Sequence, residues 1–266
     1  MTSYAAFATY LDRLEDAELR DAGAVSWAPP VPYFGRIRSA LVATVGINPS
    51  IREFVNRDGD ELAGQSRRLP TLGSLRLKAW RQANATHIKS IADACSDYFA
   101  QNPYLRWFGV LESVLAYSGA SYYGERPVAC HLDLVPYATV SRWGDLAPWQ
   151  RQRLLVAGSG LLGRQIGNSS IETLILNGRS VINHFAAISD VRFREIAADG
   201  WRLVGAKQRS VPGVAYTAVA TKIGGVILDV PVTVIGFNHN LQSSFGVTRV
   251  AIASIGEWVS LQLVNQ

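Results

Sequence analysis

Short apolar runs that alternate with helical segments constrain the fold of this chain most strongly. Residues 40–46 ("ALVATVG"), 127–135 and 171–178 predict strands, and residues 201–237 predict several more. Helical patterns or helix-start signals occupy the stretches at 3–20, 76–100, 103–118, from Pro148, from Arg179 and at 248–264. This alternation predicts an α/β layered fold with a largely parallel sheet.

The length and composition suit one globular domain. The chain has 266 residues, of which 48% are hydrophobic and 18% charged, so it can bury a sizeable core. We expect a single domain over 1–266, with an N-terminal helix and extension at 1–39 and an α/β core at 40–266. The first residues carry acids and helical periodicity, unlike a signal peptide, and no stretch is apolar enough to span a bilayer. A soluble, cytoplasmic monomer is therefore expected.

The charge distribution indicates a polyanionic partner. The net charge is +5, and residues 52–81 carry seven basic against four acidic side chains, a net of +3 directly after the first strand. An ordinary basic protein with a solvated loop is the alternative. Cys95 and Cys130 form no CxxC pair and the four histidines are scattered, so no metal and no organic cofactor is expected.

The segment "GSGLLG" at 158–163 matches the GxGxxG pattern of dinucleotide-binding proteins. Its context differs from that motif, because the preceding "WQRQRLLVA" is too polar for a buried strand. The next strand ends in Asn177, where the motif would have an acid for the ribose. We therefore favour glycines that allow close helix packing, with a dinucleotide-dependent enzyme as the alternative.

Polar residues stand at the ends of three predicted strands, where the active sites of open α/β sheets lie. They are Asn48, Asp133 and His239. Gly46 allows a tight turn and Pro49 fixes its own φ, so Asn48 between them is held rigidly at the end of the first strand. The alternative is that Asn48 caps a following helix.

Four segments, taken together, resemble motifs of the uracil-DNA glycosylase superfamily. The segment "GINPS" resembles the first motif of its mismatch-specific and single-strand-selective branches, and "CHLDLVPYAT" resembles its base-reading strand. The stretch "LILNGRSVINHF" is similar to the strand and helix that lie between, and "GFNHNLQSSFG" resembles the histidine motif that opens a DNA-intercalating loop. The resemblance covers about residues 40–260, and it departs from the family where Asn240 replaces the usual proline.

The resemblance implies a three-layer α/β/α fold with a central, mainly parallel β-sheet, and a chemistry. Asn48 would position the water that attacks the sugar C1′ of a flipped-out nucleotide. His239, or backbone N–H groups near Ile47 and Asn48, would stabilise the departing base. No lysine stands in these motifs to act as an amine nucleophile, so simple hydrolysis that leaves an abasic site is expected.

Further residues are expected to contact the base or the DNA. Phe54 is the candidate that stacks on the base, and a core position is its alternative. Leu241 or Phe245 would act as a wedge between bases. The residues expected to bind DNA are Arg52, Arg67, Arg68, Asn240, Leu241, Gln242, Ser243, Ser244 and Arg249.

Two departures from the family indicate which base is read. Asp133 stands where uracil readers carry Asn, and a carboxylate only accepts hydrogen bonds, which favours the 4-amino group of cytosine. A turn cap or a pair with Arg142 is the alternative role of Asp133. Ser50 stands where strict uracil enzymes place a bulky Tyr, which leaves room at the 5-position of the pyrimidine.

The sequence therefore predicts a monofunctional DNA glycosylase for a 5-substituted cytosine of the hydroxymethyl or glucosyl type found in phage DNA. Such an enzyme would serve antiviral defence. One alternative is a repair glycosylase for uracil or mismatched thymine. The second is a non-catalytic DNA-binding module that keeps the pocket shape without turnover.

Overall fold

A six-stranded mixed sheet forms the centre of the computed structural model, which describes residues 4–101, 105–123, 128–204, 210–242 and 246–264. The strands are β1 (Val42–Gly46), β2 (Ala129–Asp133), β3 (Thr173–Asn177), β4 (Arg194–Val204), β5 (Ser210–Ile223) and β6 (Val226–Phe237). Their order is β2-β1-β3-β6-β5-β4. The first four in this order run parallel, and β5 and β4 are added antiparallel. The predicted α/β class is confirmed, with a sheet that is only partly parallel.

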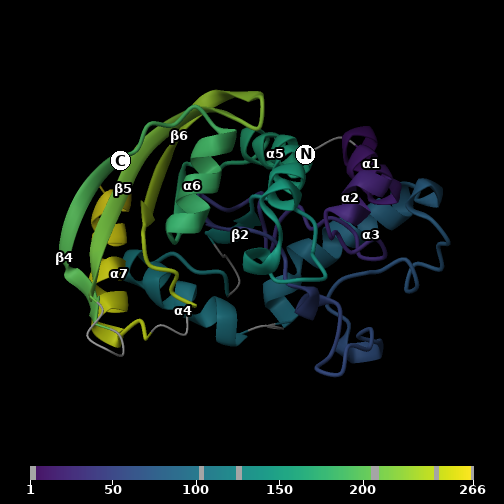
Figure 1. Ribbon diagram of the computed structural model, residues 1–266, viewed down its shortest axis with the longest axis horizontal. Helices are drawn as coiled ribbons and strands as arrows, with labels where there is room; N and C mark the ends of the chain where they lie inside the picture. The colour runs from purple at the N-terminus through teal and green to yellow at the C-terminus, as the bar shows by residue number, and fades with distance from the viewer. Residues whose placement is uncertain (1–3, 102–104, 124–127, 205–209, 243–245, 265–266) are drawn as a thin grey trace.

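Helices flank this sheet (Figure 1). They are α1 (Tyr4–Asp12), α2 (Ala17–Asp21), α3 (Ala85–Ser96), α4 (Leu105–Leu115), α5 (Pro148–Gly167), α6 (Arg179–Ile188) and α7 (Arg249–Val264). Helices α5 and α6 contact each other, and they pack on β6 and β3 respectively. Helix α7 packs on β4 and also contacts α4.

Three of the four parallel strands, β1, β2 and β3, are short and buried, whereas β6 has 12 residues and exposes several in its first half. Every residue of β1, β2 and β3 is buried, which fits their nearly continuous apolar sequences. Each strand ends where the sequence changes to Gly, Asn, Asp or Pro, so the expected strand positions hold to within a few residues. The strand ends consequently deliver polar residues to one edge of the sheet.

The glycines of "GSGLLG" lie inside helix α5 and do not form a phosphate-binding loop. A Cβ at Gly158 would collide with the Pro136 ring, and one at Gly163 would collide with the carbonyl oxygen of Ile223. These glycines let α5 approach the chain after β2 and the turn after β5. The close-packing interpretation is confirmed, and the dinucleotide alternative loses the strand-loop-helix context that it requires.

Two predicted helices are shorter than expected. The stretch at 3–20 is broken at Asp16, whose extended backbone separates a 3-10 turn from α2. The stretch at 76–100 becomes helical only at Ala85, because the Asn84 side chain accepts hydrogen bonds from the N–H groups of Thr86 and His87 and caps the helix there. In both segments a helix is present as predicted, but its predicted boundaries are wrong.

A helix that crosses a bilayer has to be both long and predominantly apolar. No helix in the described ranges is long and apolar enough to do so.

Candidate functional site

The carboxyl ends of four parallel strands meet at one edge of the sheet. Gly46 at the end of β1 pairs in register with Asp133 at the end of β2. Asn177 at the end of β3 pairs with Phe237 at the end of β6. Asn48, Asp133 and His239 therefore follow or end strands of the same edge. Asn48 stands two residues beyond Gly46, the register partner of Asp133, whereas His239 follows β6, which lies two strand positions from β1.

The amide of Asn48 is held in one orientation. Its Nδ2 donates to the carbonyl oxygens of Pro49 at 3.1 Å and Tyr137 at 3.3 Å, and to the hydroxyl of Thr139 at 3.1 Å. That hydroxyl donates its own proton to the carbonyl oxygen of Ser141 at 2.8 Å, so it can only accept from Asn48. The two protons of the NH₂ group are shared among these three acceptors, which fixes that end, and no hydrogen bond from a described residue reaches Oδ1. The site thus holds a half-buried acceptor oxygen that faces away from its anchors.

Asn48 does not cap the turn that follows it. The 3-10 turn η2 (Ile51–Glu53) is capped by Ser50, whose Oγ accepts from the Arg52 N–H at 3.2 Å. The capping alternative for Asn48 is therefore wrong. Ser50 itself is exposed, and Ile47 is half-buried between β1 and this turn.

The carboxyl group of Asp133 packs over Gly46 on the neighbouring strand. A Cβ at Gly46 would lie 2.5 Å from Oδ1 of Asp133 and 3.0 Å from Nε2 of His131. His131 Nε2 is 3.4 Å from Asp133 Oδ1, and both side chains are buried. Among the described residues Asp133 has this polar contact with His131, and no salt bridge joins it to Arg142, so the expected alternative of that pair is not formed.

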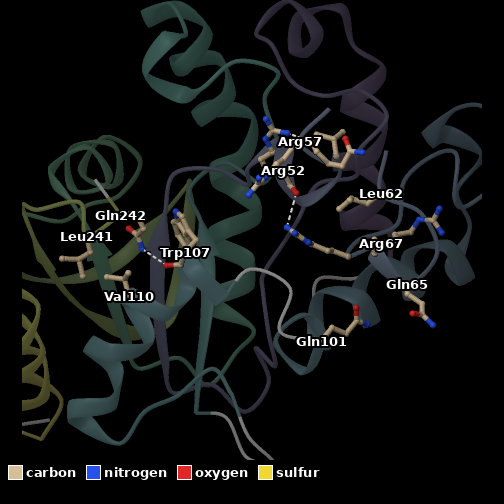
Figure 2. Close-up of a pocket in the computed structure, with 14 residues that line it drawn as sticks. Arg52, Arg57, Leu62, Gln65, Arg67, Gln101, Trp107, Val110, Leu241 and Gln242 are labelled. Atoms are coloured by element: carbon tan, nitrogen blue, oxygen red, sulfur yellow. Dashed lines mark hydrogen bonds between the residues drawn. The ribbon is translucent and has the colours of Figure 1, made fainter. Parts of the chain in front are cut away.

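A cleft of about 1340 Å³ lies beside this edge (Figure 2). Arginines of the segment after β1 line one wall: Arg52, Arg57, Arg67 and Arg68. Trp107, Val110, Leu241 and Gln242 line the other, and Figure 2 shows these two groups facing each other across the opening. No acidic side chain occurs among the described lining residues. A cleft of this kind attracts anions.

Trp107 links the cleft to the strand edge. Its indole ring lies edge-on to the His131 ring, with centroids 5.2 Å apart. His131 also contacts Asp133, so it is a neighbour both of Trp107 in the cleft wall and of the candidate base reader.

Glu53 is a buried acid that the sequence interpretation counted as part of a solvated loop. Its Oε2 accepts from the Tyr98 hydroxyl at 2.6 Å and lies 3.4 Å from the guanidinium of Arg68. Burial raises the pKa of Glu53, while the hydrogen bond from Tyr98 and the charge of Arg68 oppose this shift. Glu53 therefore connects Arg68, which lines the cleft, to the buried Tyr98.

His239 is turned toward the antiparallel part of the sheet. Its Nε2 lies 2.6 Å from the carbonyl oxygen of Trp201, so this nitrogen carries a proton and donates it. The residue is 4% exposed, and burial lowers the pKa of His239; the hydrogen bond to Trp201 opposes this shift and the charge of Arg179 adds to it. The neutral form of the histidine is thus favoured. In this conformation its Nε2–H already donates to the Trp201 carbonyl oxygen, so it is not free to donate to a base.

The segment after His239 crosses the end of β3 toward the cleft. Asn177 accepts from the Leu241 N–H at 3.2 Å and donates to Oε1 of Gln242 at 2.5 Å. Gln242 in turn donates to the carbonyl oxygen of Trp107 at 3.3 Å, as drawn in Figure 2. Leu241 and Gln242, both expected to contact DNA, therefore line the cleft, although Leu241 is only 4% exposed.

The remaining predicted DNA-binding residues fall into two groups. Arg52, Asn240 and Arg249 are exposed, and Arg67 and Arg68 are half-buried in the cleft wall. No hydrogen bond from a described residue reaches the buried Nε of Arg67. Ser243, Ser244 and Phe245 lie outside the described residues.

Phe54 does not face the cleft. It is 1% exposed, and its ring packs edge-on against Trp27 with centroids 6.0 Å apart. The structure thus places Phe54 in the hydrophobic core, as its alternative interpretation held, and no face of the ring is open to a base. The core position follows from the turn η2, which directs Phe54 inward after Glu53.

A metal centre has no ready donor set in the described part of the chain, because no group of three or more His, Cys, Asp or Glu side chains comes together there. Neither a scan against known protein-family models nor a search of curated proteins finds a match to this chain.

Proposed function

We propose that this protein is a DNA glycosylase of the uracil-DNA glycosylase superfamily type, with a three-layer α/β/α arrangement. It would act on a flipped-out 5-substituted cytosine, as carried by modified phage DNA, and leave an abasic site. In this reaction a water oxygen bonds to C1′ as the bond from C1′ to the base nitrogen breaks. One water proton stays on the new hydroxyl and the other leaves with the base.

The orientation of the Asn48 amide carries this proposal. An acceptor oxygen fixed by three hydrogen bonds on its opposite end can hold a water in one direction without being a strong base. Fixed placement of a water at the reacting carbon lowers the barrier, because the entropy of positioning is lost before the reaction. Asn48 follows the end of β1, two residues after the register partner of Asp133, so a base read by Asp133 would bring its sugar toward this strand end.

The base assignment rests on Asp133 and Ser50. A carboxylate accepts from the 4-amino group of cytosine and offers no donor to O4 of uracil. The exposed Ser50 leaves space at the 5-position, where a hydroxymethyl or glucosyl group would project. Ordinary cytosine has to be spared, because an enzyme that removed it would destroy the host genome.

The cleft supports DNA as the partner. Its four arginines would neutralise phosphates of the strand on either side of the flipped nucleotide. Stabilisation of the departing base stays a prediction for His239. That role requires the Nε2–H to leave the Trp201 carbonyl when DNA binds.

A base-release assay over defined oligonucleotides tests the proposal. Single- and double-stranded substrates would carry one uracil, G-mismatched thymine, cytosine, 5-hydroxymethylcytosine or its glucosylated form, and mass spectrometry would detect the released base. We expect release of the 5-substituted cytosines, with cytosine untouched. Release of uracil or thymine alone would establish the repair alternative, and no release from any substrate would overturn the proposal.

Gly46→Ala tests whether the contact between β1 and Asp133 matters. The new Cβ would lie 2.5 Å from the Asp133 carboxylate, which has to move. We expect base release to fall about 10²-fold, as for a misplacement of about 1 Å, and stability to fall by roughly 1–3 kcal/mol. Single-turnover rates and thermal melting measure the two effects.

Gly144→Ala is the matched control, because a Cβ there meets nothing within 4 Å. It should leave both rate and melting temperature at wild-type values. Full activity of Gly46→Ala would show that the position of Asp133 over Gly46 is not needed for turnover.

A further inference from the structure

A chain of buried polar groups lies behind Asp133. The hydroxyl of Tyr122 bonds to the hydroxyl of Thr44, and Thr44 Oγ1 lies 2.8 Å from Nδ1 of His131. His131 Nε2 then faces Asp133 Oδ1 at 3.4 Å. Thr44 and His131 pair in register on β1 and β2, as Gly46 and Asp133 do two residues further on. Since side chains alternate along a strand, these two pairs share one face of the sheet.

The proton of Tyr122 decides which group donates each hydrogen bond in this series of polar side chains. The phenol is 2% exposed, and Thr44 is its hydrogen-bond partner among the described residues. Burial raises the pKa of Tyr122 well above its usual value, so the phenol keeps its proton. If Thr44 donated to Tyr122 instead, the phenolic proton would be buried without an acceptor, which is costly. Tyr122 therefore donates to Thr44.

The remaining bonds follow from that direction. Thr44 has one proton, and with its oxygen accepting from Tyr122 it donates to Nδ1 of His131. His131 is then the tautomer with its proton on Nε2, and this proton faces Oδ1 of Asp133. The opposite tautomer would place the Nε2 lone pair against a carboxylate oxygen. Tyr122 at one end of this series and Asp133 at the other thus both favour the tautomer of His131 with its proton on Nε2.

Aromatic packing keeps the His131 ring in place. Trp107 and Phe108 lie edge-on to it with centroids at 5.2 and 5.1 Å, and Phe34 lies at 5.8 Å. The histidine is 1% exposed. The ring therefore cannot turn to exchange its nitrogens without displacing three aromatic neighbours.

We propose that His131 is a positioning residue that holds Oδ1 of Asp133 through its Nε2–H and leaves Oδ2 as an acceptor for the amino group of the target base. The side chain of Asp133 is 4% exposed, and no hydrogen bond from a described residue reaches Oδ2. With Oδ1 turned to His131, Oδ2 is the acceptor left in a fixed position for the base, which favours an aminopyrimidine over uracil. This inference rests on the proposed function.

The double variant Thr44→Val with Tyr122→Phe tests the chain. It removes both hydroxyls together, so no buried hydroxyl loses its partner, and Val suits a buried strand. Tyr122→Phe alone is the matched control, because Thr44 can still donate to His131. Two readouts are needed: the His131 tautomer from two-bond ¹H–¹⁵N spectra, assigned with His131→Asn, and the ratio of hydroxymethylcytosine to uracil release.

We expect the Nε2–H tautomer in the wild type and in Tyr122→Phe, and a mixture of tautomers in the double variant. The release ratio of the double variant should fall about 10- to 100-fold, because Asp133 loses the fixed position that its contact with Nε2 of His131 gives it. Thr44→Ser keeps the hydroxyl and should behave as the wild type.

The outcomes separate this inference from the proposed function. An Nδ1–H tautomer in the wild type would overturn it even if the variants failed to fold. An unchanged release ratio in the folded double variant would overturn the positioning role while base release itself continued. Absence of base release from the wild type would overturn the proposed function, and this inference with it.

Discussion

Replacing Asn48 with alanine is expected to reduce base release by about 10²- to 10³-fold while DNA affinity stays within a factor of a few. The side chain positions the attacking water in the proposed reaction, and its hydrogen bonds go to Pro49, Tyr137 and Thr139, which are not among the residues that line the cleft. Single-turnover release measures the first effect, and filter binding or fluorescence anisotropy at fixed salt measures the second.

Two further variants sharpen this test. Asn48→Asp keeps the shape but places a carboxylate against three acceptors, so the side chain has to leave its position and activity should fall as far as in Asn48→Ala. Asn168→Ala removes an exposed amide at the end of α5, whose side-chain partner among the described residues is the Arg164 carbonyl, and should be fully active.

The same experiment separates the enzyme from a DNA-binding module. A module without turnover would lose neither affinity nor biological effect in Asn48→Ala. If the variant released bases at the wild-type rate, the water-positioning role of Asn48 would be wrong even if the protein is a glycosylase. Thermal melting checks that the loss of anchors at Tyr137 and Thr139 has not unfolded the edge.

The positions of Asn48 and Asp133 were predictable because they depend on local signals. A buried run that stops at Gly or Asp marks a strand end, and parallel strands bring their carboxyl ends to one edge. His131 carried a similar signal, since it stands two residues before Asp133 and must share its face of the strand. The family motif that this strand resembles marks Asp133 and not His131, whereas the alternation of the strand marks both.

Other parts of the site depend on contacts that no local pattern encodes. Glu53 is buried only because Tyr98, 45 positions later, donates to it and Arg68 approaches from the cleft. The orientation of His239 follows from the irregular pairing of β4 and β5, which brings the Trp201 carbonyl to its Nε2. Composition made the loop after β1 look solvated, whereas tertiary packing decides which of its residues face inward.

Replacing Asp133 with asparagine is expected to shift base preference from cytosine-type bases toward uracil. With the His131 Nε2–H facing this side chain, the new amide would turn its oxygen to the histidine and its NH₂ toward the base. That NH₂ is a donor for O4 of uracil and clashes with the 4-amino group of cytosine. A reading interaction of about 1–3 kcal/mol corresponds to a change in the release ratio of about 10- to 100-fold.

Asp145→Asn is the matched control, because it makes the same change of charge on an exposed residue of the loop after β2. It should keep the wild-type base preference. A general effect of the lost charge on DNA binding would appear in both variants and can therefore be separated from an effect on base preference. The release ratio is measured with hydroxymethylcytosine and uracil in the same sequence context. A folded Asp133→Asn with the wild-type ratio would remove Asp133 as base reader. Loss of all release without a gain on uracil would assign the carboxylate to the reaction itself, since reading alone predicts a gain on one base for the loss on the other.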